Sequence, residues 1–266
     1  MDREDYYSHY QANLDLLNCE IDLVKKAAQT AIGKKSWQEK KGHNINQMAA
    51  TDKEIQACTR LYSFLICSWF EARLMKILHE NSSAAFSDAE ITSIRQLDTM
   101  DKKWKTSFSM AVCKSYGFTY IGNINYASYF TIGSLPQKNY SDILGLFDDI
   151  VDAIKIRNRL AHGQCKTQFN SKNTAIANYA FFSMYDNIQK LDILKQCFDH
   201  IGDIISAYVT YKDKNNPRFD ENIRRKIELI HDKKTRIKNS DYRKYTSQLG
   251  RRYESKRNQN IPPDSD

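Results

Sequence analysis

The chain has 266 residues, of which 41% are hydrophobic and 27% are charged, a composition that is ordinary for a folded soluble protein. Nine Gly, four Pro and four Val are few for this length, which disfavours a strand-rich fold because sheets need turn residues and β-branched runs. No stretch of 18 apolar residues occurs and the first residues, M-D-R-E-D-Y, are polar and acidic, so we expect neither a membrane-spanning helix nor a secretory signal.

The net charge of +8 is concentrated at the end of the chain. Residues 212–266 hold 16 Lys and Arg against 9 Asp and Glu, so the rest of the chain is nearly neutral. A basic segment on a neutral body is typical of a protein that binds a polyanion such as nucleic acid. The alternative is a solvated helix that only aids solubility.

The six cysteines are scattered and form no C-x-x-C pair, which predicts reduced thiols in a cytoplasmic protein rather than disulfides or a zinc site. The histidines outside residues 157–163 show no H-x-x-H or H-E-x-x-H spacing. We therefore expect no metal and no cofactor.

The first half of the chain predicts long helices. Apolar residues at helical spacing predict a helix over residues 3–31 that ends at Gly33, followed by a polar loop over residues 33–47. Thr51 or Asp52 could cap a second helix that runs to about His79. Its run L-Y-S-F-L-I-C-S-W-F-E-A-R-L-M-K-I-L is apolar nearly all round, so this helix should be the central buried one.

The remaining elements are also expected to be helical. The sequence predicts a short helix capped by Ser87 or Asp88, then a helix from Thr99 to Tyr116 that Gly117 ends, and an aromatic loop over 118–138. A helix from Asn139 or Ser141 to Gly163 follows. The last predicted elements are a helical run over 174–212, broken near Asn187, and a helix over about 220–238. The predicted architecture is an all-α antiparallel bundle. Its domain spans residues 1–212, followed by a basic helical arm over 213–257, which Pro217 separates from the domain, and a disordered tail over 258–266.

The helix that ends at Gly163 places a charge where a core residue would be expected. Ile143, Phe147, Ile150, Ile154 and Ala161 fall on one stripe of a 3.6-residue helix. The Arg157 side chain projects within roughly 20° of the Ile150 direction, along that same stripe. A guanidinium in an apolar seam costs several kcal/mol unless an anion meets it, which indicates either a carboxylate of this protein or a phosphate of a substrate.

The run R-N-R-L-A-H-G, residues 157–163, resembles the signature of the HEPN family, small all-helical domains whose members are mostly RNA endonucleases. The family pattern is Arg, a polar residue that is often Asn, three further residues and then His, near the end of a long helix. Arg157, Asn158 and His162 match this pattern in full, and the resemblance covers roughly residues 51–212.

The resemblance implies metal-independent RNA cleavage, with products that carry a 2′,3′-cyclic phosphate and a 5′-hydroxyl. His162, with an ordinary imidazole pKa of about 6.5, suits proton transfer near neutrality. Arg157 offers a fixed fork of donors to phosphate oxygens. Asn158, which stacks with His162 at i,i+4, could orient the phosphate or fix the tautomer of His162.

The family also implies partners and a further residue. Two HEPN protomers join their motifs in one composite cleft, so a homodimer is expected here. Family members often carry an acidic or polar residue in an earlier helix that faces the Arg–His pair, and Glu71 is the candidate. Many members are bacterial toxins or anti-phage defence proteins, which implies a cognate inhibitor or antitoxin.

Three alternatives remain open at the level of sequence. Arg157 could pair with a carboxylate such as Asp149 or Asp152 in a buried bridge, while Asn158 and His162 simply cap the helix. Glu71 could pair with Arg73 or Lys76, or reach water. The chain could also be a catalytically inactive HEPN-like module that binds nucleotide, RNA or protein.

Overall fold

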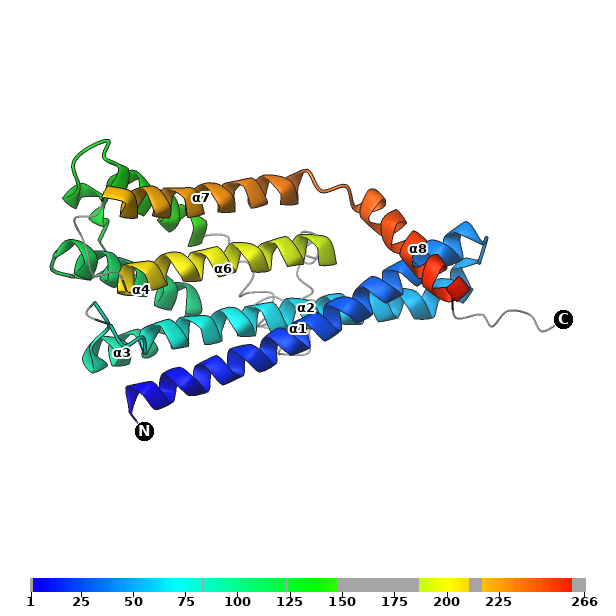
Figure 1. Cartoon of the computed structure of the whole chain (residues 1–266), viewed down its shortest axis with the longest axis horizontal. Coiled ribbons are helices and arrows are strands. Elements are labelled where there is room, and N and C mark those ends of the chain that lie inside the picture. Colours follow the sequence, from blue (N-terminus) through cyan, green and yellow to red (C-terminus); the bar gives the residue numbers. More distant parts are fainter. Residues whose placement is uncertain (1, 83, 123, 148–186, 211–216, 260–266) are drawn as a thin grey trace, which may run out of the picture.

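The computed structural model describes residues 2–82, 84–122, 124–147, 187–210 and 217–259, and within these ranges it contains helices and no strand. The all-helical fold class is thus confirmed for this part of the chain (Figure 1). The helices are α1 (Arg3–Lys40), α2 (Ile45–Leu78), α3 (Asp88–Arg95), α4 (Met100–Tyr116), the 3₁₀ helix η1 (Tyr126–Tyr129), a helical segment over 135–147, α6 (Ile188–Thr210), α7 (Pro217–Lys238) and α8 (Tyr242–Gln259).

Two long helices, α1 and α2, form an antiparallel hairpin along the length of the molecule (Figure 1). Lys35 of α1 lies 2.7 Å from Asp52 near the turn, and the ammonium of Lys76 lies 4.5 Å from the centre of the Tyr7 ring at the other end. Both helices begin with a capping box, in which the N-cap side chain and the side chain three residues later satisfy each other's backbone N–H groups.

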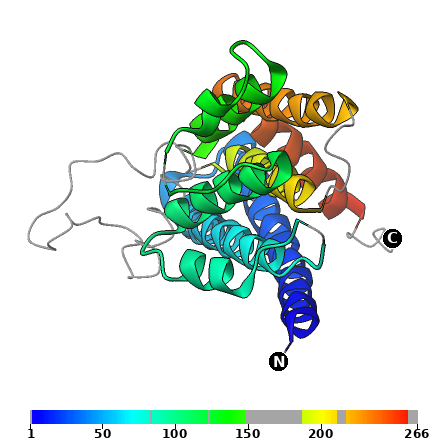
Figure 2. The same cartoon turned by 90° about the vertical axis from the view of Figure 1, so that its left-hand side faces the viewer.

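Helix α6 lies in the middle of the fold and contacts α2, α4 and α7 (Figure 2). It runs parallel to α2, because Asp192 accepts a hydrogen bond from Tyr62 while Asp203, later in α6, pairs with Arg73. It runs antiparallel to α7, whose Lys226 also reaches Asp203 at 3.1 Å. The expected antiparallel arrangement therefore holds for α1–α2 and α6–α7, whereas α2 and α6, which are not consecutive in the chain, are parallel.

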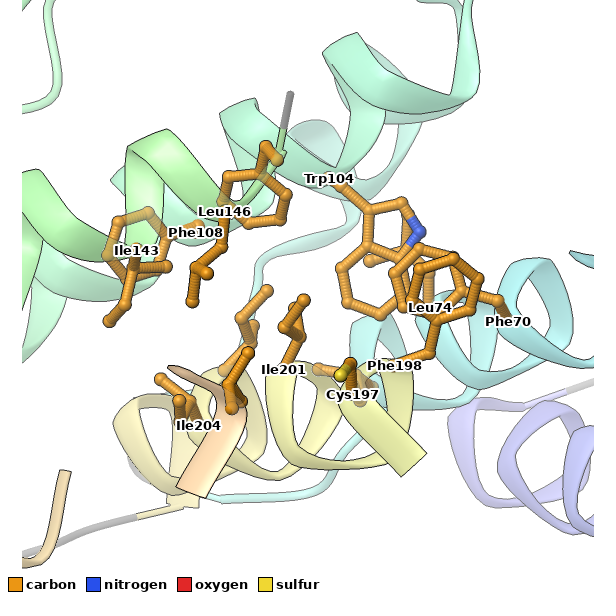
Figure 3. Close-up of a cluster of buried hydrophobic side chains, with 14 of the residues drawn as sticks. Phe70, Leu74, Trp104, Phe108, Ile143, Leu146, Cys197, Phe198, Ile201 and Ile204 are labelled. Atoms are coloured by element: carbon orange, nitrogen blue, oxygen red, sulfur yellow. The ribbon is translucent and has the colours of Figure 1, made fainter. Parts of the chain in front are cut away.

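The core is centred on a stack of three aromatic rings from three helices (Figure 3). Phe70 of α2 lies 4.0 Å from Trp104 of α4 and 4.2 Å from Phe198 of α6, measured between ring centroids. All three side chains are essentially inaccessible to solvent. The apolar half of α2 is thus buried, as the sequence predicts, but it shares the centre of the fold with α6.

The predicted end of the first helix is wrong. Gly33 does not end the first helix, which continues through most of the expected loop to Lys40. Gly33 lies under α8 instead, where an added Cβ would stand 2.7 Å from the carbonyl oxygen of Leu249. The glycine is needed for close helix packing, and this packing offsets the cost, roughly 1 kcal/mol, of a glycine inside a helix.

Helix α2 also begins earlier than predicted. Its N-cap is Asn44, whose side chain accepts from the Gln47 N–H at 3.0 Å, and Thr51 lies inside the helix as a buried residue. The pattern N-x-x-Q is a capping box, and it places the N-cap almost two turns before Thr51. The predicted end near His79 is confirmed, since His79 is the C-cap.

The short helices match their predicted caps. Ser87 caps α3 and Thr99 precedes α4, which ends at Gly117 with φ +72°, a left-handed conformation that favours glycine. The aromatic segment that follows is largely irregular apart from η1. Asn187 stands immediately before α6, where its side chain accepts from the Gln189 N–H, so a helix begins directly after this residue. The part of the predicted helical run before Asn187 lies outside the described residues.

The described part of the basic arm packs on the body. Ile223, Ile227 and Ile230 of α7 form the predicted apolar stripe and are almost completely buried against the core. Helix α8 packs along the C-terminal half of α1 and runs parallel to it, since Gln29 bonds Tyr245 and Lys40 pairs with Glu254. Helix α8 extends to Gln259, so the first two residues of the predicted disordered tail are helical.

Candidate functional site

The segment that leads into the R-N-x-x-x-H motif is helical over residues 135–147. Its start is four residues earlier than the predicted Asn139, because Ser134 accepts from the Gln137 N–H and Pro136 suits the first turn of a helix. Asn139 is instead fully buried within the helix and donates its side-chain amide to the Asp220 carbonyl at 2.9 Å. The prediction of a helical approach to the motif is thus confirmed up to residue 147, with a corrected start.

The apolar stripe of this segment faces the core. Ile143 and Phe147, the first two members of the predicted stripe, have no accessible surface. The Phe147 ring lies 5.8 Å from that of Phe108, and Ile143 and Leu146 point into the same cluster (Figure 3). The remaining members of the stripe, Ile150, Ile154 and Ala161, lie outside the described residues.

Arg157, Asn158 and His162 also lie outside the described residues, so their contacts with one another and with Glu71 remain predictions. Before the motif, the structure describes the chain up to residue 147.

Helix α7 anchors the approach segment through polar contacts. Arg224 donates to Asp142 at 2.5 Å, and Asp220 accepts from the Tyr116 hydroxyl at 2.5 Å, which ties α7 to α4 as well. Burial raises the pKa of the Asp220 carboxyl above its usual range, although the hydrogen bond from Tyr116 works in the opposite direction. These contacts fix the rotation and register of the segment that carries the chain toward the motif.

Glu71 lies on α2, partly buried, directly after the core residue Phe70. Both cations that could neutralise it locally have other partners: Arg73 donates to Asp203 at 3.0 Å, and Lys76 lies over the Tyr7 ring. The role of Glu71 at the motif stays a prediction.

An apolar cavity of about 200 Å³ adjoins the end of the approach segment. Leu146 forms part of its wall, and α6 and α7 supply the rest, including Phe198 and Ile230. Three lysines, Lys190, Lys234 and Lys238, complete the lining. The cavity beside segment 135–147 is thus lined mostly by apolar side chains, together with three cations.

His79 of the described residues has a structural environment. His79 is buried, stacks on Tyr6 and Tyr10, and has its Nδ1 2.7 Å from the Met75 carbonyl. Burial lowers the pKa of His79, which favours the neutral ring. Across the described ranges, no three His, Cys, Asp or Glu side chains gather as a metal site would require. In the same ranges, no helix has the length and apolar character needed to cross a membrane.

A basic groove between α1 and α8 is a candidate site that the sequence predictions do not include. Its volume is about 570 Å³, and it is lined by Lys26, Gln29, Thr30, Leu249, Arg251, Arg252, Tyr253, Ser255 and Lys256. The charge of the arm is readable in the sequence, but Lys26 lies at the opposite end of the chain. Only the packing of α8 on α1 brings these cations together.

No family model matches the chain, and comparisons with curated proteins and with solved structures find no match either. Its function is therefore inferred from the chain's own residues: the motif over 157–163 and the packing of segment 135–147 that leads to it.

Proposed function

We propose that the protein is a metal-independent endoribonuclease of the HEPN type. The observation that carries the proposal is the run R-N-R-L-A-H-G over residues 157–163 in an all-helical chain. Support comes from segment 135–147, which is helical and buries its apolar stripe, since the family pattern places the motif near the end of a long helix. A guanidinium that continues such a stripe needs an anionic partner, and a substrate phosphate would supply it.

The proposed chemistry is an intramolecular transfer. A base, for which His162 is the candidate, takes the proton of the ribose 2′-OH, and the 2′-oxygen attacks the adjacent phosphorus. The bond to the 5′-oxygen breaks, and this oxygen is protonated by an acid as it leaves. Arg157 stabilises the charge on the non-bridging oxygens, Asn158 positions the phosphate or the imidazole, and Glu71 orients Arg157 or His162. The products are a 2′,3′-cyclic phosphate and a 5′-hydroxyl.

A homodimer follows from this mechanism, because one protomer supplies one motif histidine while the reaction uses a base and an acid. Two protomers would bring two copies of His162 to one composite cleft. Sedimentation velocity of the purified protein should show a dimer at the concentration used for activity. A monomer that cleaves RNA would contradict the composite cleft.

The direct test is incubation of the purified protein with total RNA in excess EDTA, beside the His162→Ala variant. We expect the wild type to cleave and the variant to be slower by a factor of about 10² or more, as for the loss of a general acid–base group. Circular dichroism and thermal unfolding should show that the variant keeps its fold. Equal residual activity in both preparations would indicate a contaminating nuclease and would refute the proposal.

The second candidate is an inactive HEPN-like module that binds RNA without cleaving it. The observation in its favour is the basic groove between α1 and α8, which is formed without the motif. Binding of RNA that weakens steeply with salt, together with no cleavage in EDTA or in Mg²⁺, would support this candidate over the first.

The biological setting is part of the same proposal. The family resemblance suggests a toxin or an anti-phage defence effector that acts on cytoplasmic RNA and is held in check by a cognate inhibitor. Expression of the wild type and of His162→Ala in a bacterial host tests this role: growth arrest by the wild type alone is expected. Equal growth of both strains, at matched protein levels, would contradict toxicity.

A further inference from the structure

The groove between α1 and α8 gathers four cations with no acidic side chain in its lining. Lys26 stands on α1, and Arg251, Arg252 and Lys256 stand on α8. All four side chains belong to solvent-exposed residues, and within the described residues none of them forms an ion pair. Arg252 and Lys256 are also neighbours at i,i+4, a like-charge spacing that costs a few tenths of a kcal/mol in a helix.

The single acidic residue of α8 does not relieve this repulsion. Glu254 pairs with Lys40 at 2.9 Å and reaches Lys41 at 4.0 Å, both at the C-terminal end of α1. These lysines hold the pKa of the Glu254 carboxyl below its usual range, so the glutamate is ionised and already neutralised at pH 7. The four cations of the groove thus create a positive potential, and a bound anion would reduce the repulsion between them.

The position of α8, and with it the shape of the groove, is set by close packing. A Cβ on Gly33 would stand 2.7 Å from the Leu249 carbonyl oxygen, and one on Gly250 would stand 2.6 Å from the Ser36 hydroxyl. The Arg257 guanidinium lies 4.3 Å from the centre of the Trp37 ring, which adds a cation–π contact at the end of α8. The backbone positions that carry the cations of the two helices are therefore held by this packing.

We propose that this groove binds single-stranded RNA, with its cations on successive phosphates. The choice of RNA among polyanions rests on the proposed function; the arrangement of the cations does not. Arginines bind phosphate oxygens bidentately, and Gln29 and Thr30 offer hydrogen bonds to sugar or base edges. Tyr253, half-buried in the lining, adds an aromatic surface, and grooves of cations with aromatic side chains are typical of single-strand binding.

The test compares two charge-neutralising double variants of α8 in a His162→Ala background, in which the RNA is not cleaved. The groove variant carries Arg252→Gln and Lys256→Gln. The matched control carries Arg243→Gln and Lys244→Gln, two exposed residues of the same helix that do not line the groove. Both variants lose the same charge. Fluorescence anisotropy with a labelled single-stranded oligouridine RNA gives Kd at several salt concentrations.

We expect the groove variant to bind roughly tenfold more weakly at physiological salt, with a slope of log K against log salt that is smaller by about 1.4. The control should change Kd by less than about threefold. Equal losses in both variants would show unspecific attraction to a basic helix and would overturn the proposal. Failure of the parent His162→Ala protein to bind the RNA, or binding to phosphatidylserine vesicles in place of RNA, would also overturn it.

The experiment separates this proposal from the nuclease proposal. If the groove binds RNA but the wild type does not cleave it in EDTA, the groove assignment stands and the nuclease proposal fails. If the wild type cleaves RNA and the groove variant binds as tightly as its parent, the nuclease proposal stands and the groove assignment fails.

Discussion

Replacing Arg157 by alanine should lower the rate of RNA cleavage by a factor of about 10² to 10³, as for removal of one charge-stabilising donor from an active site. If Arg157 serves the proposed phosphate site and not a carboxylate of the core, the unfolding temperature should change little. Single-turnover cleavage of a defined RNA and a thermal unfolding curve of the same preparation measure both quantities.

Arg157→Lys is the matched control for this prediction. It keeps the positive charge and loses the planar fork of donors, so we expect an intermediate rate. The competing structural role predicts the opposite pattern. If Arg157 instead forms a buried bridge to a carboxylate, Arg157→Ala should lower the free energy of unfolding by several kcal/mol, in the range of about 3–5 kcal/mol for a broken buried pair.

Replacing Phe70 by alanine should lower the free energy of unfolding by about 3–5 kcal/mol, the usual cost of removing a large aromatic side chain from a core. Phe70 joins three helices through its stacks on Trp104 and Phe198, so the cavity that it leaves cannot close without moving α4 or α6. Urea unfolding followed by far-ultraviolet circular dichroism gives the difference.

Leu61→Ala on the same helix is the control for the Phe70 variant. The Leu61 side chain is 48% exposed, so its loss should change the free energy of unfolding by less than about 0.5 kcal/mol. A similar effect of both substitutions would contradict the central position of the Phe70 stack.

The elements that the sequence predicted correctly are those decided by local chemistry. Ser87 and Gly117 mark helix ends through a side-chain cap and a left-handed turn, both of which are readable from a few neighbouring residues. The burial of the second half of α2 follows from a run that is apolar nearly all round. The capping box of Asn44 and Gln47 is equally local, but Thr51 and Asp52 are also good N-cap residues, and the sequence prediction chose these later positions.

The errors occur where distant parts of the chain meet. Gly33 was expected to end a helix because glycine commonly does so, whereas the structure uses it for the contact with Leu249 of α8. Helix α8 packs on α1 through Tyr245, Leu249 and Tyr253, but its many charged residues make this apolar face hard to recognise in the sequence. The proximity of Lys26 and Arg252 is not predictable from the sequence alone, because only the packing of the two helices creates the groove.

The motif itself is a different case. Arg157, Asn158 and His162 could be singled out because their types and spacing resemble a known pattern, and the buried residues Ile143 and Phe147 bear out the first part of the stripe on which Arg157 was placed. Three-residue patterns do not fix geometry, so chemical evidence must decide their role.

The most direct measurement of the central claim is an analysis of the RNA ends that the wild-type protein produces in EDTA, with a second substrate whose riboses are replaced by 2′-deoxyriboses. The account predicts 2′,3′-cyclic phosphate and 5′-hydroxyl ends, no cleavage of the deoxy substrate, and no such ends with His162→Ala. Products with 5′-phosphate ends, or cleavage of the deoxy substrate, would contradict attack by the 2′-hydroxyl and the mechanism built on it.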